Sequence, residues 1–171
     1  GGGSGGEGRQ GWAVSGWRGV GPRVAGCGGG SYYGDVGPGG LPARARGALG
    51  PGVMLDLEPA VTRETALGGH LVQGHVDATT ELTARSAVGD GARLAFRLPP
   101  DLARYIVAKG SIAIDGVSLT VASVTGDEFQ VAIIPHTMSQ TTLGSLVEGA
   151  KVNIEVDVIA KYVERLLRER S

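Results

Sequence analysis

Two histidines in the glycine-rich stretch GGHLVQGHVD, residues 68–77, are the first side chains able to do chemistry. His70 and His75 are five positions apart, so they do not share a helix face as the histidines of an HExxH zinc motif do. One interpretation is structural: the glycines let strands cross closely, and a histidine satisfies backbone carbonyls. In the other, Gly74 lets a flat ligand approach the backbone while His75 offers a donor or acceptor near neutral pH. The glycine spacing favours a ligand.

Two hydroxyls form a second candidate group, on a predicted β-hairpin over residues 111–121 (SIAIDGVSLTV). The pair Asp115-Gly116 favours a tight type I′ turn between its two alternating runs. Because side chains alternate along a strand, Ser118 and Thr120 point to one face and the apolar residues between and beside them to the other. Taken alone, these hydroxyls also suit a solvated strand face, so their meaning depends on their surroundings.

A cation and an apolar run flank this hairpin. Lys109 ends a predicted helix over residues 102–109 and would bring its ammonium group towards an anionic heterocycle or a polyol. In the run IIPHT at residues 133–137, Pro135 should interrupt the strand ladder and leave backbone groups free to recognise a uracil-like edge. Hydrolase classes find no support, because no Ser-His-Asp spacing, catalytic carboxylate pair or nucleophile elbow is recognisable.

Short strands and two helices must position these groups. Apolar residues alternate at 129, 131 and 133 and again at 152, 154 and 156, a spacing typical of a barrel, and residues 53–58 could form a further strand. The helix at 102–109 resembles a barrel plug. A predicted C-terminal helix over residues 158–170 carries an apolar stripe that must dock on its own barrel or on another subunit's helix. The stripe comprises Ile159, Val163, Leu166 and Leu167.

Length and composition exclude several classes of protein. A chain of 171 residues suits one ordinary domain, and its net charge of −1 with 5% aromatic residues argues against nucleic-acid binding. No apolar run approaches the ~20 residues of a membrane helix, and no signal peptide is evident, so we expect a cytoplasmic protein without a membrane partner. One cysteine, Cys27, makes an internal disulfide impossible and a metal site improbable.

The composition changes near residue 50. Residues 1–50 hold 20 of the 31 glycines and show no hydrophobic periodicity, so we expect this part to be largely irregular. It could be a disordered leader, a segment that folds against a partner, or the out-of-frame remnant of a domain. Residues 51–66 are predicted to be a linker, residues 67–157 the barrel, and residues 158–171 the C-terminal helix.

The motifs GGHLVQGHVD, KGSIAIDGVSLTVASV, FxVxIIPHT, TTLGxLxxGxxVNIEVD and AKYVERLL follow one another in the order found in riboflavin synthase. Residues 67–167 resemble the second lumazine-binding domain of that family, and residues 47–61 resemble the end of its first domain. The resemblance implies an all-β protein with a six-stranded Greek-key barrel, short helices and a C-terminal amphipathic helix. It also implies a homotrimer built through that helix.

The resemblance further implies a reaction. Two molecules of 6,7-dimethyl-8-ribityllumazine dismutate by four-carbon transfer to riboflavin and 5-amino-6-ribitylamino-uracil, with no metal or other cofactor. Carried over by motif position, the catalytic candidates are His75, Ser118, Thr120 and Asp157. The substrate-binding candidates are Gly74, His75, Val76, Lys109, Ser118, Leu119, Thr120, Ile133, Ile134, Pro135, His136, Thr137 and Met138.

The sequence also departs from the family. Riboflavin synthase has two similar barrels, and its site forms between the first barrel of one subunit and the second barrel of another. The family's opening MFTGIV and its NGVCLTV motif are absent here. A non-catalytic lumazine- or flavin-binding module is therefore the alternative function, followed by a flavoprotein-reductase barrel, which lacks its Arg-x-Tyr-Ser strand here.

Overall fold

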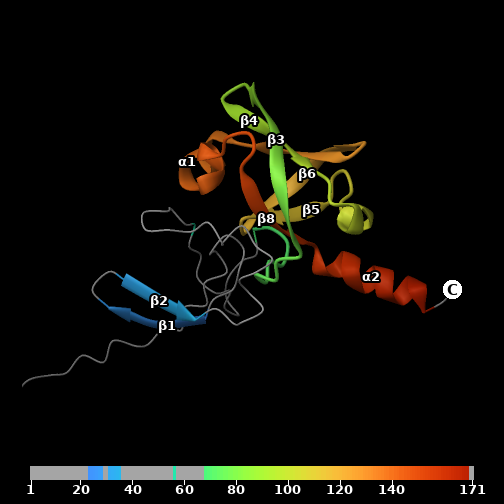
Figure 1. Cartoon of the computed structure of the whole chain (residues 1–171), viewed down its shortest axis with the longest axis horizontal. Helices are drawn as coiled ribbons and strands as arrows, with labels where there is room; N and C mark the ends of the chain where they lie inside the picture. The colour runs from blue at the N-terminus through green and yellow to red at the C-terminus, as the bar shows by residue number, and fades with distance from the viewer. Residues whose placement is uncertain (1–22, 29–30, 36–55, 57–67, 170–171) are drawn as a thin grey trace, which may run out of the picture.

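The computed structural model describes residues 23–28, 31–35, 56 and 68–169 of the chain. Six antiparallel strands close into a barrel in the order β3-β4-β7-β6-β5-β8 (Figure 1). Strand β8 returns to lie beside β5, so β8-β5-β6-β7 is a Greek key, as predicted. The strands are β3 Ala78–Val88, β4 Gly91–Arg97, β5 Ser111–Ile114, β6 Val117–Thr125, β7 Glu128–Ile133 and β8 Lys151–Val156.

Two phenylalanines fill the middle of the barrel. Phe96 on β4 lies opposite Phe129 on β7 in the strand register, and their rings stack with centroids 5.5 Å apart. Both side chains are fully buried, as are Leu82, Leu94 and Val131 around them. In each strand the buried apolar residues alternate with outward-facing ones, because a strand turns successive side chains to opposite faces.

The predicted hairpin at residues 111–121 is confirmed. Strands β5 and β6 pair from Ile114↔Val117 to Ser111↔Thr120. The two turn residues, Asp115 and Gly116, have φ values of 46° and 89°. Positive φ at both central positions is what a type I′ turn requires, and it matches the twist of the flanking strands.

The predicted helix at residues 102–109 is wrong in type and length. The structure has a short 3₁₀ helix, η3 Pro100–Tyr105, and Lys109 lies beyond it with a φ of 70°. The Lys109 amide donates to the Val121 carbonyl over 2.8 Å, and the Val121 amide donates to the Gly110 carbonyl over 2.9 Å. Residues 109 and 110 therefore extend the β5–β6 ladder. Because their backbone groups bond to Val121 in this ladder, they are not available for helical hydrogen bonds.

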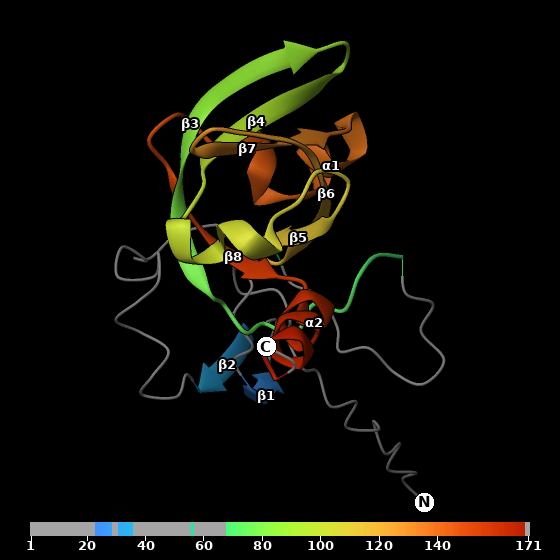
Figure 2. The same ribbon diagram turned by 90° about the vertical axis from the view of Figure 1, so that its right-hand side faces the viewer.

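Three further helices complete the barrel region: α1 Pro135–Gln140, the 3₁₀ helix η4 Thr142–Ser145, and α2 Val158–Arg168. Helices α1 and η4 fill the connection from β7 to β8, and α2 extends away from the barrel (Figures 1 and 2). The predicted C-terminal helix is thus confirmed from residue 158 to 168. Residue 170, its expected last residue, lies outside the described part.

The residues described before position 50 form a hairpin that the composition did not reveal. Strands β1 Arg23–Gly28 and β2 Ser31–Asp35 pair antiparallel with an irregularity between Val24 and Gly26. The rest of residues 1–50 lies outside the described residues. So does the possible strand at 53–58, except for Asp56, whose carboxylate accepts hydrogen bonds from Thr142.

Truncation of the central aromatic pair tests the packing. Phe129→Ala should lower the free energy of unfolding by about 3–5 kcal/mol, because it deletes a buried ring and leaves a cavity against Phe96. Val88→Ala is the control, since Val88 is 53% exposed at the end of β3. Denaturant unfolding measures both, and equal small losses would contradict this account of the core.

Candidate functional site

The outer face of β5, β6 and β8 carries a row of three small or polar side chains. Ala113 pairs with Ser118 on one side and with Glu155 on the other. Their neighbours along each strand point into the core, so this row must face outward. Ala113 is nonetheless 1% exposed and Glu155 4% exposed, so something covers the outside of the barrel here.

Part of the cover is the glycine-rich stretch at residues 68–77, which crosses these strands before β3 begins. The Gln73 amide donates to Glu155 Oε1 over 2.8 Å, and His70 Nδ1 lies 2.8 Å from Ser118 Oγ. The backbone approaches closely at Gly69: a Cβ there would lie 2.5 Å from Ser118 Oγ, so a larger residue would displace the hydroxyl that lies beside His70. Gly74 is buried with a φ of 74°, a conformation that favours glycine.

Asp77 bonds the end of the glycine-rich stretch to strand β8 of the barrel. Its amide donates to the Ile154 carbonyl over 2.9 Å, and its Oδ2 accepts from the Val156 amide over 2.9 Å. Its Oδ1 also lies 2.6 Å from Lys161 Nζ on α2. One carboxylate thus joins the glycine-rich stretch, β8 and the C-terminal helix.

Two polar atoms under this cover have no partner among the described residues. Glu155 Oε2 and His70 Nε2 are both buried and make no hydrogen bond there. An unsatisfied buried polar atom costs on the order of 1–3 kcal/mol, and more where the group is charged. A water molecule or a ligand with donor groups would remove this cost, so we take the His70–Ser118–Glu155 region as the candidate site.

The structure divides the predicted β6 contacts between two faces. Ser118 and Thr120 both lie on the outer, exposed face, as the alternation predicted. Leu119 instead packs against the buried core, so its side chain is on the opposite side of the sheet from the hydroxyls. Lys109 is exposed. It lies beside Val121 because its amide bonds to the Val121 carbonyl in the extended β5–β6 ladder, and it does not end a helix as predicted.

The predicted apolar wall at residues 133–138 is a strand end followed by a helix. Ile133 is 1% exposed in the core, whereas Ile134 is 61% exposed. Pro135 ends the ladder as expected and begins α1, where its fixed φ is suited to the first helical position. His136 is exposed, and Thr137 and Met138 are half-buried. Since β6 and β7 are antiparallel, with Val121 opposite Val131, the chain leaves β7 for α1 at the end of β6 that carries Ser118.

The remaining candidates have differing surroundings. Asp157 is the N-cap of α2, and its Oδ1 accepts from the Ile159 amide over 2.9 Å, which is a sufficient structural reason for a carboxylate there. His75 is exposed and Val76 half-buried. The described residues contain no group of three or more histidine, cysteine or acidic side chains placed to hold a metal ion.

Sequence reasoning missed Gln73, Asp77 and Glu155 as parts of this site and gave His70 no role in it. Glu155 alternates with apolar residues like any exposed strand position, so its burial could not be inferred from β8 alone. The sequence did offer one signal, the glycine at position 69. A glycine in such a stretch indicates that the backbone passes close to other residues, here to Ser118 on the barrel.

Comparison with known proteins now identifies the region. The family described as the lumazine binding domain matches residues 73–157. The riboflavin synthase of Mycobacterium tuberculosis is 50% identical over 125 residues, which cover 71% of this chain and 62% of that protein. The Bacillus subtilis riboflavin synthase is 39% identical over 137 residues, covering 80% of this chain and 64% of that protein. Over this region the chain is homologous to riboflavin synthases.

The homologue spans less than two thirds of the length of these relatives. Its fold is also that of LumP, whose crystal structure with 6,7-dimethyl-8-(1'-D-ribityl) lumazine superposes with a TM-score of 0.74 at 20% identity. The structure of LumP complexed with riboflavin gives 0.75 at 23% identity. Both matches cover 85% of this chain and 78% of LumP.

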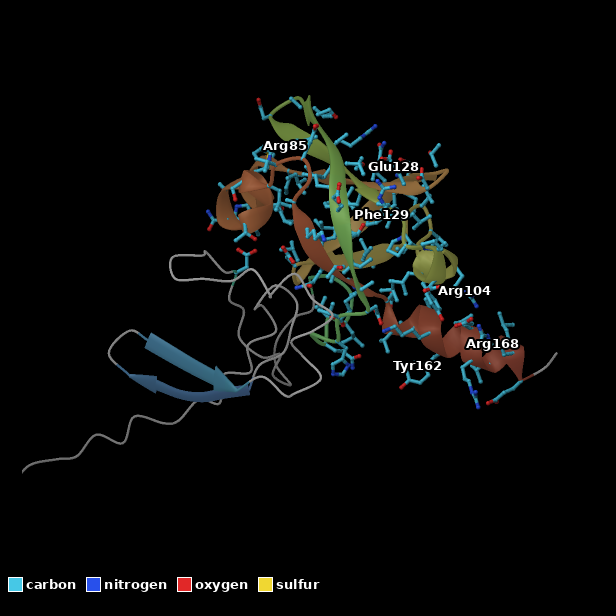
Figure 3. All side chains as sticks on the ribbon, in the orientation of Figure 1. Arg85, Arg104, Glu128, Phe129, Tyr162 and Arg168 are labelled. Carbon is cyan, nitrogen blue, oxygen red and sulfur yellow. The ribbon has the colours of Figure 1, made fainter. Side chains whose placement is uncertain are left out.

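In this riboflavin synthase homologue, α2 is held beside the barrel by its polar side. Glu164 accepts hydrogen bonds from the Tyr105 hydroxyl and from Arg104 on η3, the latter over 2.6 Å. It also lies 2.6 Å from Arg168 on its own helix. Figure 3 shows Arg104 between η3 and α2, with Tyr162 on the side of α2 away from the barrel.

These contacts make the attachment of α2 sensitive to acid. The hydrogen bond from Tyr105, and next that from Arg104, lowers the pKa of Glu164 below its ordinary value of 4.5. The bond to Glu164 correspondingly raises the pKa of Tyr105. A lowered pKa means that the folded state favours the carboxylate, so this stabilisation is present above pH 4.5 and disappears as the pH falls through the folded-state pKa.

Removing the charge tests this attachment. Glu164→Gln should unfold more easily than the unchanged chain at pH 6. The difference should shrink below pH 4.5, where the unfolded chain takes up a proton at Glu164, and disappear below the folded-state pKa, where the carboxyl group is protonated in both states. Thermal unfolding followed from pH 3 to pH 6 measures the effect. Glu169→Gln is the control, since Glu169 forms an exposed ion pair with Arg165 one turn away on the same helix. A Glu164→Gln difference that is independent of pH would contradict the assignment.

Proposed function

We propose that the chain binds 6,7-dimethyl-8-ribityllumazine on the outer face of β5, β6 and β8 and converts it to riboflavin. The observation that carries the proposal is that two buried atoms, Glu155 Oε2 and His70 Nε2, find no partner among the described residues, in a chain 50% identical to a riboflavin synthase over 125 residues. The ribityl hydroxyls and the ring N–H and carbonyl groups of a lumazine offer the donors and acceptors that these atoms lack.

The proposed chemistry is a dismutation that needs no redox cofactor or metal. One lumazine loses a proton from its acidic C7 methyl group, the other adds a nucleophile at C7, and a four-carbon unit then passes between the rings. Together the two substrates contain every atom of riboflavin and 5-amino-6-ribitylamino-uracil. The rate advantage would therefore come from holding two rings face to face and from hydrogen bonds to the developing charge.

Within this proposal the residues have separate tasks. Ser118 and Thr120 bind polar groups of the ligand from the outer face of β6, and Gly74, His75 and Val76 lie along its ring. Lys109 provides a cation, and residues 133–138, from the end of β7 into α1, form the opposite wall. Leu119 and Ile133, whose side chains face the core, contribute through their backbones. His75 and Asp157 are the proposed groups for proton transfer.

A binding module without catalysis is the second candidate. It is favoured by the likeness to LumP, whose crystal structures hold dimethylribityllumazine and riboflavin, and by the single barrel within residues 68–169. The two candidates differ in turnover but share the ligand. A cytoplasmic location is proposed for either. It rests on the sequence composition, and no described helix is long and apolar enough to cross a membrane.

Titration with 6,7-dimethyl-8-ribityllumazine, followed by ligand fluorescence and by riboflavin formation, tests the proposal. Ser118→Ala and Glu155→Gln should each weaken binding about tenfold, the loss expected when a hydrogen bond at a buried polar group is removed. Ser86→Ala, an exposed hydroxyl on β3, should have no effect. Binding without riboflavin would select the module, and binding unaffected by both variants would move the site off this face.

We further propose a homotrimer that assembles through α2. Polar contacts attach this helix to its own barrel, which leaves Ile159, Val163, Leu166 and Leu167 between 49% and 62% exposed. Tyr162 extends the same apolar surface and is 67% exposed. An apolar surface of this kind favours packing against another copy of the helix, since water contact is unfavourable.

A charge on that surface should prevent assembly. Leu166→Glu should lower the mass measured by light scattering to that of a single chain while leaving the barrel folded, because Leu166 is 62% exposed in one chain. Val88→Glu is the matched control, at 53% exposure on β3. If Leu166→Glu leaves the mass unchanged, the helix does not mediate assembly.

A further inference from the structure

The segment from α1 to η4 is fixed by an arginine from a distant strand. Arg85 Nη1 on β3 donates to the Gly144 carbonyl over 2.9 Å and to the Leu146 carbonyl over 3.0 Å. The backbone amide of Arg85 also donates to Glu148 Oε1 over 3.2 Å. Figure 3 shows Arg85 at the edge of the barrel beside α1. A charged donor therefore satisfies two carbonyls at the end of η4, where helix carbonyls otherwise lack partners.

A carboxylate from before the barrel holds the other end of η4. Both carboxylate oxygens of Asp56 accept from the Thr142 amide, over 3.0 and 3.1 Å, and Oδ2 accepts from the Thr142 hydroxyl over 2.8 Å. These contacts also account for part of the TTLG motif. Its second threonine binds Asp56, its leucine, Leu143, is fully buried, and its glycine presents a carbonyl to Arg85.

Gly144 links the position of η4 to that of α1. A Cβ at Gly144 would overlap the carbonyl oxygen of Met138, so the two backbones are in direct contact. Met138 in turn donates its amide to the Ile134 carbonyl over 3.0 Å and packs against the core. Since no free space separates η4 from α1, a displacement of η4 must displace the α1 backbone as well.

We propose that Arg85 and Asp56 are positioning residues for the ligand wall formed by α1, Arg85 acting through Gly144 on Met138. The inference rests on the proposed lumazine site. Neither residue lies on the outer face of β5, β6 and β8, so both act without touching the ligand. A small shift of a wall lowers affinity because the ring contacts depend on close packing.

The chemistry of Arg85 suggests a discriminating set of variants. Both of its bonds to carbonyls come from a single nitrogen, so a lysine ammonium, with three donors on a long stem, can replace them. Arg85→Met keeps a long apolar stem but removes the donor. Arg93→Met on the neighbouring strand is the matched control, because Arg93 is exposed and lies across from Ser86 in the register.

Hydrogen exchange and lumazine titration together test the proposal. Arg85→Met should speed exchange at the amides of Met138, Thr141 and Gly144, leave the Leu94 amide unchanged, and weaken lumazine binding about tenfold. Arg85→Lys should restore most of the affinity, and Arg93→Met should match the unchanged chain. Thr142→Val removes one hydrogen bond to Asp56 and should weaken lumazine binding about threefold. It is the alternative test variant if Arg85→Met folds poorly.

The outcomes separate the two proposals. If the unchanged chain binds lumazine and both Arg85→Met and Thr142→Val bind within twofold of it, the positioning role is refuted. Unchanged exchange at Met138 and Thr141 in Arg85→Met would refute the mechanical link through Gly144. If the unchanged chain fails to bind lumazine, the proposed function fails instead, while the exchange measurement still decides whether Arg85 holds α1.

Discussion

Closure of the barrel between β3 and β8 is the constraint on which the rest of the structure depends. Ala78 at the start of β3 pairs with Ile154 in the middle of β8. The residues directly before β3 must therefore pass over β8 and its neighbours. That path carries the glycine-rich stretch across the outer face, where His70 meets Ser118 and Gln73 meets Glu155. The candidate site is thus a consequence of closure, since closure supplies both its floor and its cover.

The same crossing explains the unusual burial of polar groups on the outside of a barrel. Outward residues of an antiparallel sheet normally face water. Here Asn153 and Glu155 on β8 are only 1% and 4% exposed, so the β8 part of the outer face is a second, polar core. Glu155 Oε1 accepts from the Gln73 amide, but Glu155 Oε2 and His70 Nε2 have no partner among the described residues. A buried polar surface with donors and acceptors left over is suited to a ligand rich in amide edges and hydroxyls.

The C-terminal helix shows how attachment and assembly can use opposite sides of one element. Its charged side chains bind η3 and Asp77, so the helix is placed before any partner is present. Its apolar side remains exposed. Asp77 belongs both to the cover of the candidate site and to this attachment, so the site and the helix share a fixed point. Arg85 and Asp56 hold the α1–η4 segment in a comparable way, by polar contacts from residues far away in the chain.

The sequence by itself determined the features that depend on local periodicity. The alternation around Asp115-Gly116 predicted the β5–β6 hairpin and the outward direction of Ser118 and Thr120, and the apolar stripe predicted α2. These follow from side-chain period and turn chemistry, which act over a few residues. The helix expected at 102–109 failed because a long-range ladder bond between Lys109 and Val121 competes with local helix propensity. The hairpin β1–β2 had no periodic signal in its glycine-rich surroundings.

Only the tertiary structure decided which residues meet. The cover over Glu155, its contact with Gln73 and the contact of Arg85 with Gly144 all join positions that are far apart in the chain and that the fold brings together. Whether a strand residue that faces outward is wet or covered depends on the path of a distant segment, and alternation carries no information about that path. The sequence therefore specified the strands and their faces, while closure of the barrel decided which face became a site.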